Sequence, residues 1–223
     1  MPRIARAVVP DCPHHATQRG SNRTDIFFDR QDREFFLQCL RKWSIETDTQ
    51  VLAYCLMTNH FHLLLSPARA DGLGRCLHGI TFRYAQYFNR RNRRCGRLWQ
   101  NRYYSCPVDL GRHLWAVARY VERNPVRAGI VRRVEDWPWS SAEAHTRGTK
   151  NSVLTEPGWL TKDEVSEYRH YLTDTGMEDE IRRATKTGRP LGPADFVLKL
   201  EKHLKRPLLA RRVGRPRKTG GEK

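Results

Sequence analysis

The sequence predicts an α+β fold, in which helices cover an antiparallel sheet. Residues 50–57 and 60–66 are two apolar runs separated by a two-residue turn, as expected for paired antiparallel strands. Residues 30–47 and 71–94 instead carry apolar side chains at helical spacing. Because helical segments interrupt a small number of strands with hairpin-like connections, the pattern favours a layered α+β sandwich.

The other elements follow in chain order. We expect a first strand around residues 14–18, followed by a Gly-Ser-Asn turn. Residues 97–107 alternate enough to predict another strand or a hairpin. Residues 110–124 are predicted to form a helix that Asp109 caps and Pro125 ends.

Charge divides the chain into three parts. The 223 residues include 41 Lys and Arg against 24 Asp and Glu, a formal charge of +17 that favours a polyanionic partner. Residues 1–150 carry a net +12, residues 151–181 a net −6 and residues 182–223 a net +11. We therefore predict a main domain, an acidic connector and a basic C-terminal extension. In the extension, Gly192 and Pro193 open a short amphipathic helix.

Cysteine usage and hydropathy point to a cytoplasmic protein. The six cysteines have no Cys-x-x-Cys spacing, so we interpret them as reduced thiols rather than a zinc cluster or a disulfide framework. No signal peptide and no apolar run of 18 residues is present, so no membrane association is expected.

The most informative motif is His60-Phe61-His62, within an apolar run. Alternate side chains of a strand share a face, so the two histidines point the same way, with their attachment points about 6.6 Å apart at about 3.3 Å per residue. Such a pair suits a metal ion. Zinc would normally require one or two further ligands, and histidines satisfied within the core are the alternative.

A second candidate group lies on the helix at 110–124. Tyr120 and Asn124 are four residues apart, so a phenol and an amide lie on one helix face. The structural alternative is that Tyr120 packs at the edge of the core and Asn124 only closes the helix before Pro125.

Together these residues resemble the HUH endonuclease superfamily, and within it the REP-associated tyrosine transposases, which are related to the single-strand insertion-sequence transposases. Four blocks carry the resemblance in family order, and they lie at residues 17–29, 54–65, 98–104 and 119–141. One departure is Thr58, where relatives commonly carry proline, and we expect no catalytic consequence.

The resemblance implies a fold, an activity and a set of roles. The fold would be a ferredoxin-like antiparallel sheet with helices packed on it, and residues 1–150 would be the catalytic domain. His60 and His62 would bind a divalent metal, Mg²⁺ or Mn²⁺, Tyr120 would be the nucleophile, and Asn124 would offer a third ligand. The expected activity is that of a single-stranded DNA endonuclease and strand transferase, which forms a covalent 5′-phosphotyrosine on hairpins of repetitive extragenic palindromes.

Other functions and assemblies remain open. One alternative is a chromosomal DNA-binding protein or regulator that keeps the fold without cleaving. A weaker one is a rolling-circle replication initiator or relaxase, against which the single Tyr120 and the absence of a helicase segment argue. The chain could act as a monomer or as a homodimer, and we expect it in the cytoplasm, associated with the nucleoid.

Several basic and polar side chains are candidates for DNA contact. Arg19, Asn22 and Arg23 flank the first turn and carry donors suited to phosphates and base edges. In the helix at 71–94, arginines alternate with aromatic residues that could stack on unpaired bases, although an ordinary solvated helix face is the alternative. These arginines are Arg83, Arg90, Arg91, Arg93 and Arg94. Arg215 and Arg217 lie in a Gly-Arg-Pro-Arg segment similar to an AT-hook, or in a basic tail of low specificity.

Overall fold

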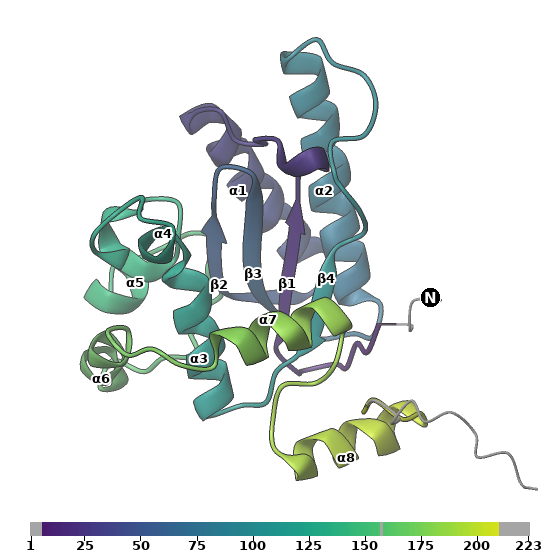
Figure 1. Ribbon diagram of the computed structural model, residues 1–223, viewed down its shortest axis with the longest axis vertical. Coiled ribbons are helices and arrows are strands. Elements are labelled where there is room, and N and C mark those ends of the chain that lie inside the picture. Colours follow the sequence, from purple (N-terminus) through teal and green to yellow (C-terminus); the bar gives the residue numbers. More distant parts are fainter. Residues whose placement is uncertain (1–5, 157, 210–223) are drawn as a thin grey trace, which may run out of the picture.

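The computed structural model describes residues 6–209 with the exception of residue 157 (Figure 1). The first part of the chain forms β1 (His14–Arg19), the 3₁₀ turn η1 (Ser21–Arg23), α1 (Arg30–Glu46), β2 (Thr49–Leu56), β3 (His60–Pro67), α2 (Gly72–Arg91) and β4 (Tyr104–Pro107). The second part is helical and comprises α3 (Arg112–Glu122), α4 (Asn124–Arg127), the 3₁₀ turn η2 (Val134–Asp136), α5 (Ala142–Arg147), α6 (Glu164–Tyr171), α7 (Glu178–Thr187) and α8 (Ala194–Leu204).

The four strands form one antiparallel sheet in the order β2-β3-β1-β4. With the chain order β1-α1-β2-β3-α2-β4, this is the ferredoxin-like arrangement, so the fold expected from the sequence is confirmed. β1 and β3 lie at the centre, with Thr17 opposite His62 and Arg19 opposite His60. The centre of the sheet therefore brings β1 alongside the histidine motif.

Helices cover both faces of the sheet (Figure 1). α1 and α2 pack on one face, where Phe61, Leu63 and Leu65 join a large apolar core. α3 and α7 pack on the other face, where Leu64 joins a second core with Val117. Because successive side chains of β3 enter different cores, the face that carries His62 is the one covered by α3 and α7.

α1 and α2 approach each other closely at one glycine. A Cβ at Gly79 of α2 would lie 2.1 Å from a ring carbon of Trp43 on α1. At the start of α1, the Asp29 carboxylate accepts the backbone N–H of Asp32 at 3.1 Å and caps the helix. The glycine therefore permits the close contact between the two helices, and the cap marks the start of α1.

Two predicted elements differ in the structure. The strand or hairpin expected at 97–107 is reduced to β4. Before β4, Trp99 forms an isolated antiparallel bridge with Gly20, and its indole N–H donates to the Thr81 carbonyl of α2 at 2.9 Å. The helix expected to start at Leu110 begins after Gly111, whose φ of +64° is left-handed, and Leu110 is exposed rather than buried.

The expected role of Pro125 was also wrong. α3 ends at Glu122, and Pro125 lies in the first turn of the short helix α4. Proline is well tolerated there, because the N–H groups of the first turn have no partner within a helix.

The charge boundaries proposed at 150/151 and 181/182 do not coincide with a break in packing. Tyr168 of α6 and Ile181 of α7 are fully buried in the same core as Val117 of α3. α7 itself spans the second boundary, with Glu178, Asp179 and Glu180 in its first turn. The acidic segment therefore packs on the sheet unit instead of separating it from the basic part.

α8 forms the amphipathic helix predicted after Pro193. Its residues Leu200 and Leu204 pack with Ala7 and Val9 in a third, smaller cluster. All six cysteines are free thiols, as expected. Among the described helices, none combines the length and the hydropathy that a bilayer crossing requires.

Candidate active site

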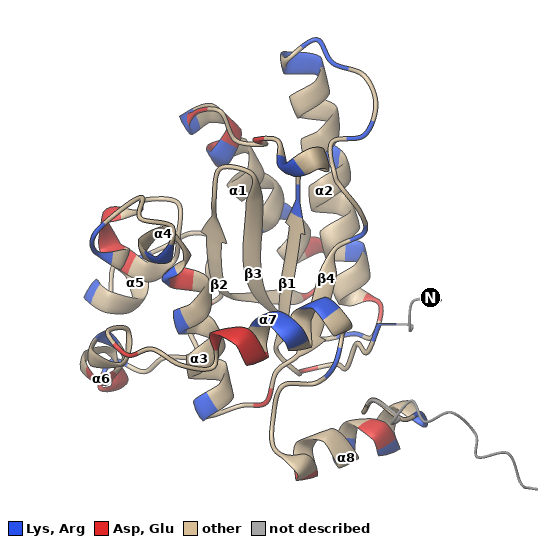
Figure 2. Cartoon of the chain, viewed as in Figure 1, with Lys and Arg blue, Asp and Glu red and all other residues tan. Residues whose placement is uncertain are grey.

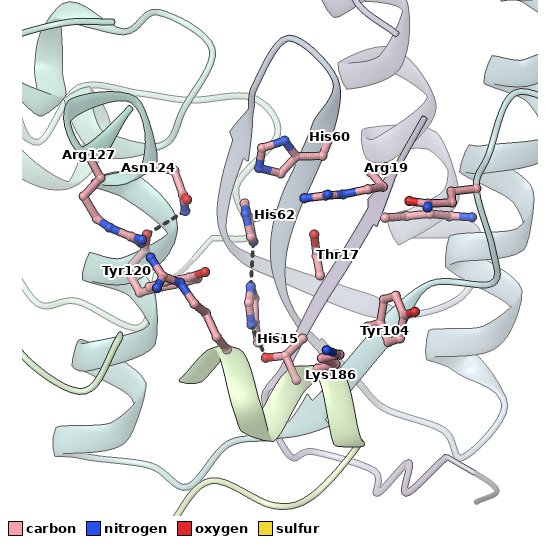
Figure 3. A pocket seen from close by; sticks show the side chains of 14 residues that line it. His15, Thr17, Arg19, His60, His62, Tyr104, Tyr120, Asn124, Arg127 and Lys186 are labelled. Carbon is pink, nitrogen blue, oxygen red and sulfur yellow. Dashed lines mark hydrogen bonds between the residues drawn. The ribbon is translucent and has the colours of Figure 1, made fainter. Parts of the chain in front are cut away.

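β3 presents His60 and His62 on the face of the sheet covered by α3 and α7, and their rings meet at right angles with centroids 5.0 Å apart (Figure 3). His60 donates its Nδ1–H to the Asn59 side-chain oxygen at 2.7 Å, because the Asn59 amide nitrogen is already donating to the Arg23 carbonyl. His62 Nδ1 lies 2.9 Å from His15 Nε2. Each ring thus engages Nδ1, and its Nε2 carries no hydrogen bond to another described residue.

β1 adds a row of polar side chains to this face. Because Thr17 pairs with His62 and Arg19 with His60, strand alternation places His15, Thr17 and Arg19 on the side of the histidine motif. His15 is buried, and its ring lies nearly parallel to that of His62, at an angle of 11° and with a centroid separation of 5.2 Å.

The histidines of the site are uncharged at neutral pH. Burial lowers the pKa of His60 to about 4, with a smaller contribution from the charge of Arg19. Burial also lowers the pKa of His15 to about 3 and holds that of His62 well below its ordinary value. Neutral imidazoles have a lone pair on one ring nitrogen, which is the form that binds a metal ion.

α3 carries Tyr120 to the same place. Its ring stands edge-on to His62, with centroids 5.5 Å apart, and edge-on to His15 at 5.6 Å (Figure 3). The Arg127 guanidinium carbon lies 4.9 Å from the centre of the Tyr120 ring, a cation–π contact. Burial raises the pKa of the Tyr120 phenol, and a hydrogen bond from Arg182 together with its positive charge opposes this rise.

Asn124 lies at the junction of α3 and α4. Its amide nitrogen donates to the backbone carbonyl of Tyr120 at 2.7 Å and contacts that of Val121 at 3.2 Å. These bonds fix the side chain and leave its oxygen as the atom that can serve as a ligand. The residue lines the same pocket as Tyr120, so the two expected site residues of this helix lie together.

The side chains surround a pocket of about 570 Å³ with a strongly positive lining (Figure 3). Arg19, Arg127, Arg182 and Lys186 line it, and no carboxylate is among the described lining residues. A phosphodiester carries a negative charge, so this lining would attract it and stabilise the additional charge that develops during attack. The arrangement combines a phenol, two neutral imidazoles and a positive field.

The donor atoms fit a divalent cation bound to few protein ligands. Nε2 of His60 and of His62 and the side-chain oxygen of Asn124 are the candidate ligands, and Mn²⁺ accepts imidazole more readily than Mg²⁺ does. Within the described part of the chain, no group of three or more His, Cys, Asp or Glu residues forms a metal site. A cation here would therefore depend on the amide and on oxygen ligands from outside the protein.

Lys and Arg are spread over several elements, among them α2 and α7 (Figure 2), and the residues proposed for DNA contact occupy different places. Arg19 lines the pocket, while Asn22 and Arg23 are exposed on the turn η1, where the Arg23 carbonyl accepts the Asn59 amide. Arg83 and Arg90 line a separate hollow on α2 beside Phe35. These residues are accessible for contact with a polyanion.

The remaining arginines lie at the end of α2 and beyond the described residues. Arg91 forms ion pairs with Asp29 and Asp32, so its charge is committed within the protein. Arg94 lies over the Phe88 ring at 5.5 Å, and Arg93 follows α2 with a positive φ. Arg215 and Arg217 fall outside the described residues.

Sequence reasoning missed part of the pocket. His15 and Thr17 could have been found by pairing the first strand with the histidine strand, because alternation then fixes which β1 residues share its face. Arg182, Thr185 and Lys186 come from α7, and the charge pattern alone gave no indication that this helix returns to the sheet.

Comparisons with known proteins agree with the fold. The family described as "Transposase IS200 like" matches residues 8–124, which contain the whole sheet, the histidine motif and Tyr120. A protein of Haemophilus influenzae, named as a candidate REP-associated tyrosine transposase, is 28% identical over 123 residues, or 49% of this chain. The match spans 65% of that relative's length.

A solved structure shows the same similarity. The structure of a REP-associated tyrosine transposase bound to a REP hairpin aligns with a TM-score of 0.55 and 17% identity, covering 73% of this chain and 96% of that one. At this identity the match is informative about the fold.

Proposed function

Because the chain belongs to the IS200-like transposase family, we propose that it is a metal-dependent endonuclease and strand transferase for single-stranded DNA. The observation that carries the proposal is the position of Tyr120. Its ring centroid lies 5.5 Å from that of His62, in a pocket lined by four Arg and Lys side chains. All these groups come from one chain, so the proposed site requires no residue from a second copy.

The proposed reaction is attack by the phenolic oxygen of Tyr120 on a backbone phosphate. A bond forms between this oxygen and phosphorus while the bond from phosphorus to the 3′ oxygen breaks. The phenol loses its proton and the departing oxygen gains one, which yields a 5′-phosphotyrosine and a free 3′ hydroxyl. The covalent bond stores the energy of the cut linkage, so a 3′ hydroxyl can later be joined by the reverse reaction.

The chain's own residues have distinct roles in this proposal. Arg127 and Arg182 hold the tyrosine ring and its hydroxyl, and together with Arg19 and Lys186 they attract the phosphate. His60, His62 and Asn124 would bind a divalent cation. Such a cation, when bound, polarises a non-bridging phosphate oxygen.

The proposed substrate is a palindrome folded into a hairpin, of the repetitive extragenic kind. The structural neighbour that binds a REP hairpin and the net charge of +17 support this choice. Arg19 of β1 lies opposite His60 and lines the pocket, and Asn22 and Arg23 follow it on η1, so these three residues could contact a strand that enters the pocket. Arg83, Arg90, Arg93 and Arg94 offer a second contact region along α2.

The test is the formation of a covalent complex. With a hairpin oligonucleotide and Mn²⁺, the wild-type protein should give a protein–DNA adduct that survives a denaturing gel. Tyr120→Phe removes only the hydroxyl, so hairpin binding should persist while the adduct disappears. Tyr103→Phe is the matched control, because Tyr103 lies under the Arg6 guanidinium and lines a different pocket.

Other outcomes would change the assignment. An adduct that persists in Tyr120→Phe would move the nucleophile elsewhere, and Tyr104, which also lines the pocket, would be tested next. Hairpin binding by the wild-type protein without any adduct would instead support a non-cleaving DNA-binding protein of the same fold.

A further inference from the structure

We propose that Thr185 and His15 form a hydrogen-bonded relay that orients His62 and presents its Nε2 lone pair to the metal ion. This assignment rests on the proposed function and gives Thr185 of α7, a helix outside the matched range of residues 8–124, a part in holding a metal ligand. Thr185 and His15 are positioning residues, because their hydrogen bonds act on the metal ligand His62.

The relay starts with the Thr185 hydroxyl. Its oxygen lies 2.8 Å from the Ile181 carbonyl, which can only accept, so the hydroxyl hydrogen is directed there. The same oxygen lies 2.7 Å from His15 Nδ1 and therefore accepts from it. The Cys106 thiol at 3.4 Å can add a weak further hydrogen bond to this oxygen. His15 is thereby fixed with its hydrogen on Nδ1.

In the second step, the hydrogen position of His15 determines which ring nitrogen of His62 carries a hydrogen. A neutral His15 with a hydrogen on Nδ1 has a lone pair on Nε2, and this atom lies 2.9 Å from His62 Nδ1. His62 must then carry its hydrogen on Nδ1 and leave Nε2 free. If His15 instead carried its hydrogen on Nε2, His62 Nδ1 would have to accept it. The hydrogen of His62 would then lie on Nε2 and block the nitrogen needed for a metal bond.

Burial makes the relay difficult to replace by solvent. His15 is 1% exposed and Thr185 is 3% exposed, so water cannot readily supply the missing acceptor if the hydroxyl is removed. The two imidazole planes are nearly parallel, at 11°, and their facing nitrogens are 2.9 Å apart, so the rings meet edge to edge. Partners of this kind, which hold a metal ligand in one tautomer, typically contribute 10- to 100-fold to metal affinity.

The experiment compares variants of the full chain in which one threonine hydroxyl is removed or replaced. Mn²⁺ affinity would be measured by calorimetry without DNA, and the hydrogen-bearing nitrogens of His15 and His62 by ¹⁵N NMR of the metal-free protein. Thr185→Val keeps the size of the side chain and should weaken Mn²⁺ binding by about 10- to 100-fold. Thr185→Ser restores a hydroxyl and should bind within about threefold of wild type, a margin within the usual scatter of side-chain effects.

Thr187→Val is the matched control on the same helix. The Thr187 hydroxyl bonds the Arg183 carbonyl at 2.7 Å and does not line the pocket, so its loss should leave Mn²⁺ affinity unchanged. NMR should place the hydrogen of His62 on Nδ1 in the wild-type protein.

Each contrary outcome has a separate meaning. Equal Mn²⁺ affinity in the wild-type protein and a folded Thr185→Val variant would overturn the relay, as would a wild-type His62 with its hydrogen on Nε2. If Thr185→Val did not fold, the NMR result on the wild-type protein would still decide the tautomer. Failure of the wild-type protein to bind Mn²⁺ at all would refute the metal site of the proposed function, and the relay's role with it.

Discussion

The Glu122 carboxylate accepts the hydroxyl of Tyr168 at 2.9 Å, which ties the helix of the candidate nucleophile to α6. The same carboxylate accepts Ser141 Oγ–H at 2.5 Å and His145 Nδ1–H at 2.6 Å, and it is fully buried. Three donors from α6, α5 and the residue preceding α5 therefore converge on one side chain of α3, two residues beyond Tyr120.

Glu122→Gln should destabilise the protein by roughly 3 kcal/mol. Glutamine replaces one acceptor oxygen by an NH₂ group that faces donors, and an unsatisfied buried partner costs about 1 to 3 kcal/mol. Urea denaturation measures the effect, and Glu143→Gln on the exposed surface of α5 is the control, with an expected change of at most about 0.5 kcal/mol. A loss equal to that of the control would show that the buried carboxylate does not hold α3.

Arg182→Gln should slow adduct formation about ten- to hundredfold at neutral pH, because a hydrogen bond to a charged group is worth roughly 1.5 to 3 kcal/mol. Burial raises the pKa of Tyr120 and Arg182 opposes this, so its removal should raise the pKa further and move the pH–rate profile to higher pH. Adduct yield against time would be measured from pH 6 to 9. Arg183→Gln makes the same charge change at the next residue of α7, which does not line the pocket, and an identical profile for both variants would contradict the role of Arg182.

Stability should fall as the pH is lowered from about 6.5, partly because of His14. Its Nδ1–H donates to the Cys12 carbonyl at 2.7 Å and its Nε2 accepts the Val9 backbone N–H at 3.4 Å, so the folded state requires the neutral ring. Burial lowers the pKa of His14 to about 4.

The unfolded chain therefore takes up a proton on His14 that the folded chain does not, and stability is lost as the pH falls from the unfolded pKa toward the folded one. At pH 4.5 the loss from His14 should be about 2 to 3 kcal/mol relative to pH 7. Urea denaturation at both pH values, with His14→Gln as the comparison, measures it. If the variant lost as much stability as the wild type between the two pH values, His14 would not be the titrating group.

Gly79→Ala should destabilise the α1–α2 pair by about 1 to 3 kcal/mol, because the new methyl group would overlap the Trp43 ring. Gly74→Ala is made in the same helix, where the nearest atom to the new Cβ is the Tyr103 hydroxyl oxygen at 3.9 Å. It should stabilise by up to about 1 kcal/mol through helix propensity alone. Thermal unfolding of both variants gives the comparison, and stabilisation by both would show that α1 can move away without cost.

The fold could be predicted because its local signals agree with one another. The two apolar runs around Thr58 and Asn59 indicate a hairpin, and the apolar stripe with Leu77 and Ile80 indicates the helix α2. Each segment therefore fits only one type of secondary structure. Where prediction failed, tertiary contacts decided. Trp99 forms an isolated bridge with Gly20 where a strand was expected, while its indole N–H bonds the Thr81 carbonyl of α2.

The candidate site was predictable where its residues are close in sequence. His60 and His62 share a face by strand alternation, and Tyr120 and Asn124 by helix periodicity, and the structure brings both pairs into one pocket. The parts contributed by β1 and α7 required knowledge of long-range packing. Local periodicity indicates which face of α7 is apolar, but not which surface that face covers.

The position of α7 has a consequence for the order in which the site is completed during synthesis. His15, His60, His62 and Tyr120 all precede α7, so a chain growing on the ribosome contains the reactive groups before it contains Arg182 and Thr185. On the assignment proposed above, a nascent chain has a tyrosine without its cation and a histidine without its relay. On that assignment, the proposed site is complete only after α7 has been synthesised and has packed on the sheet.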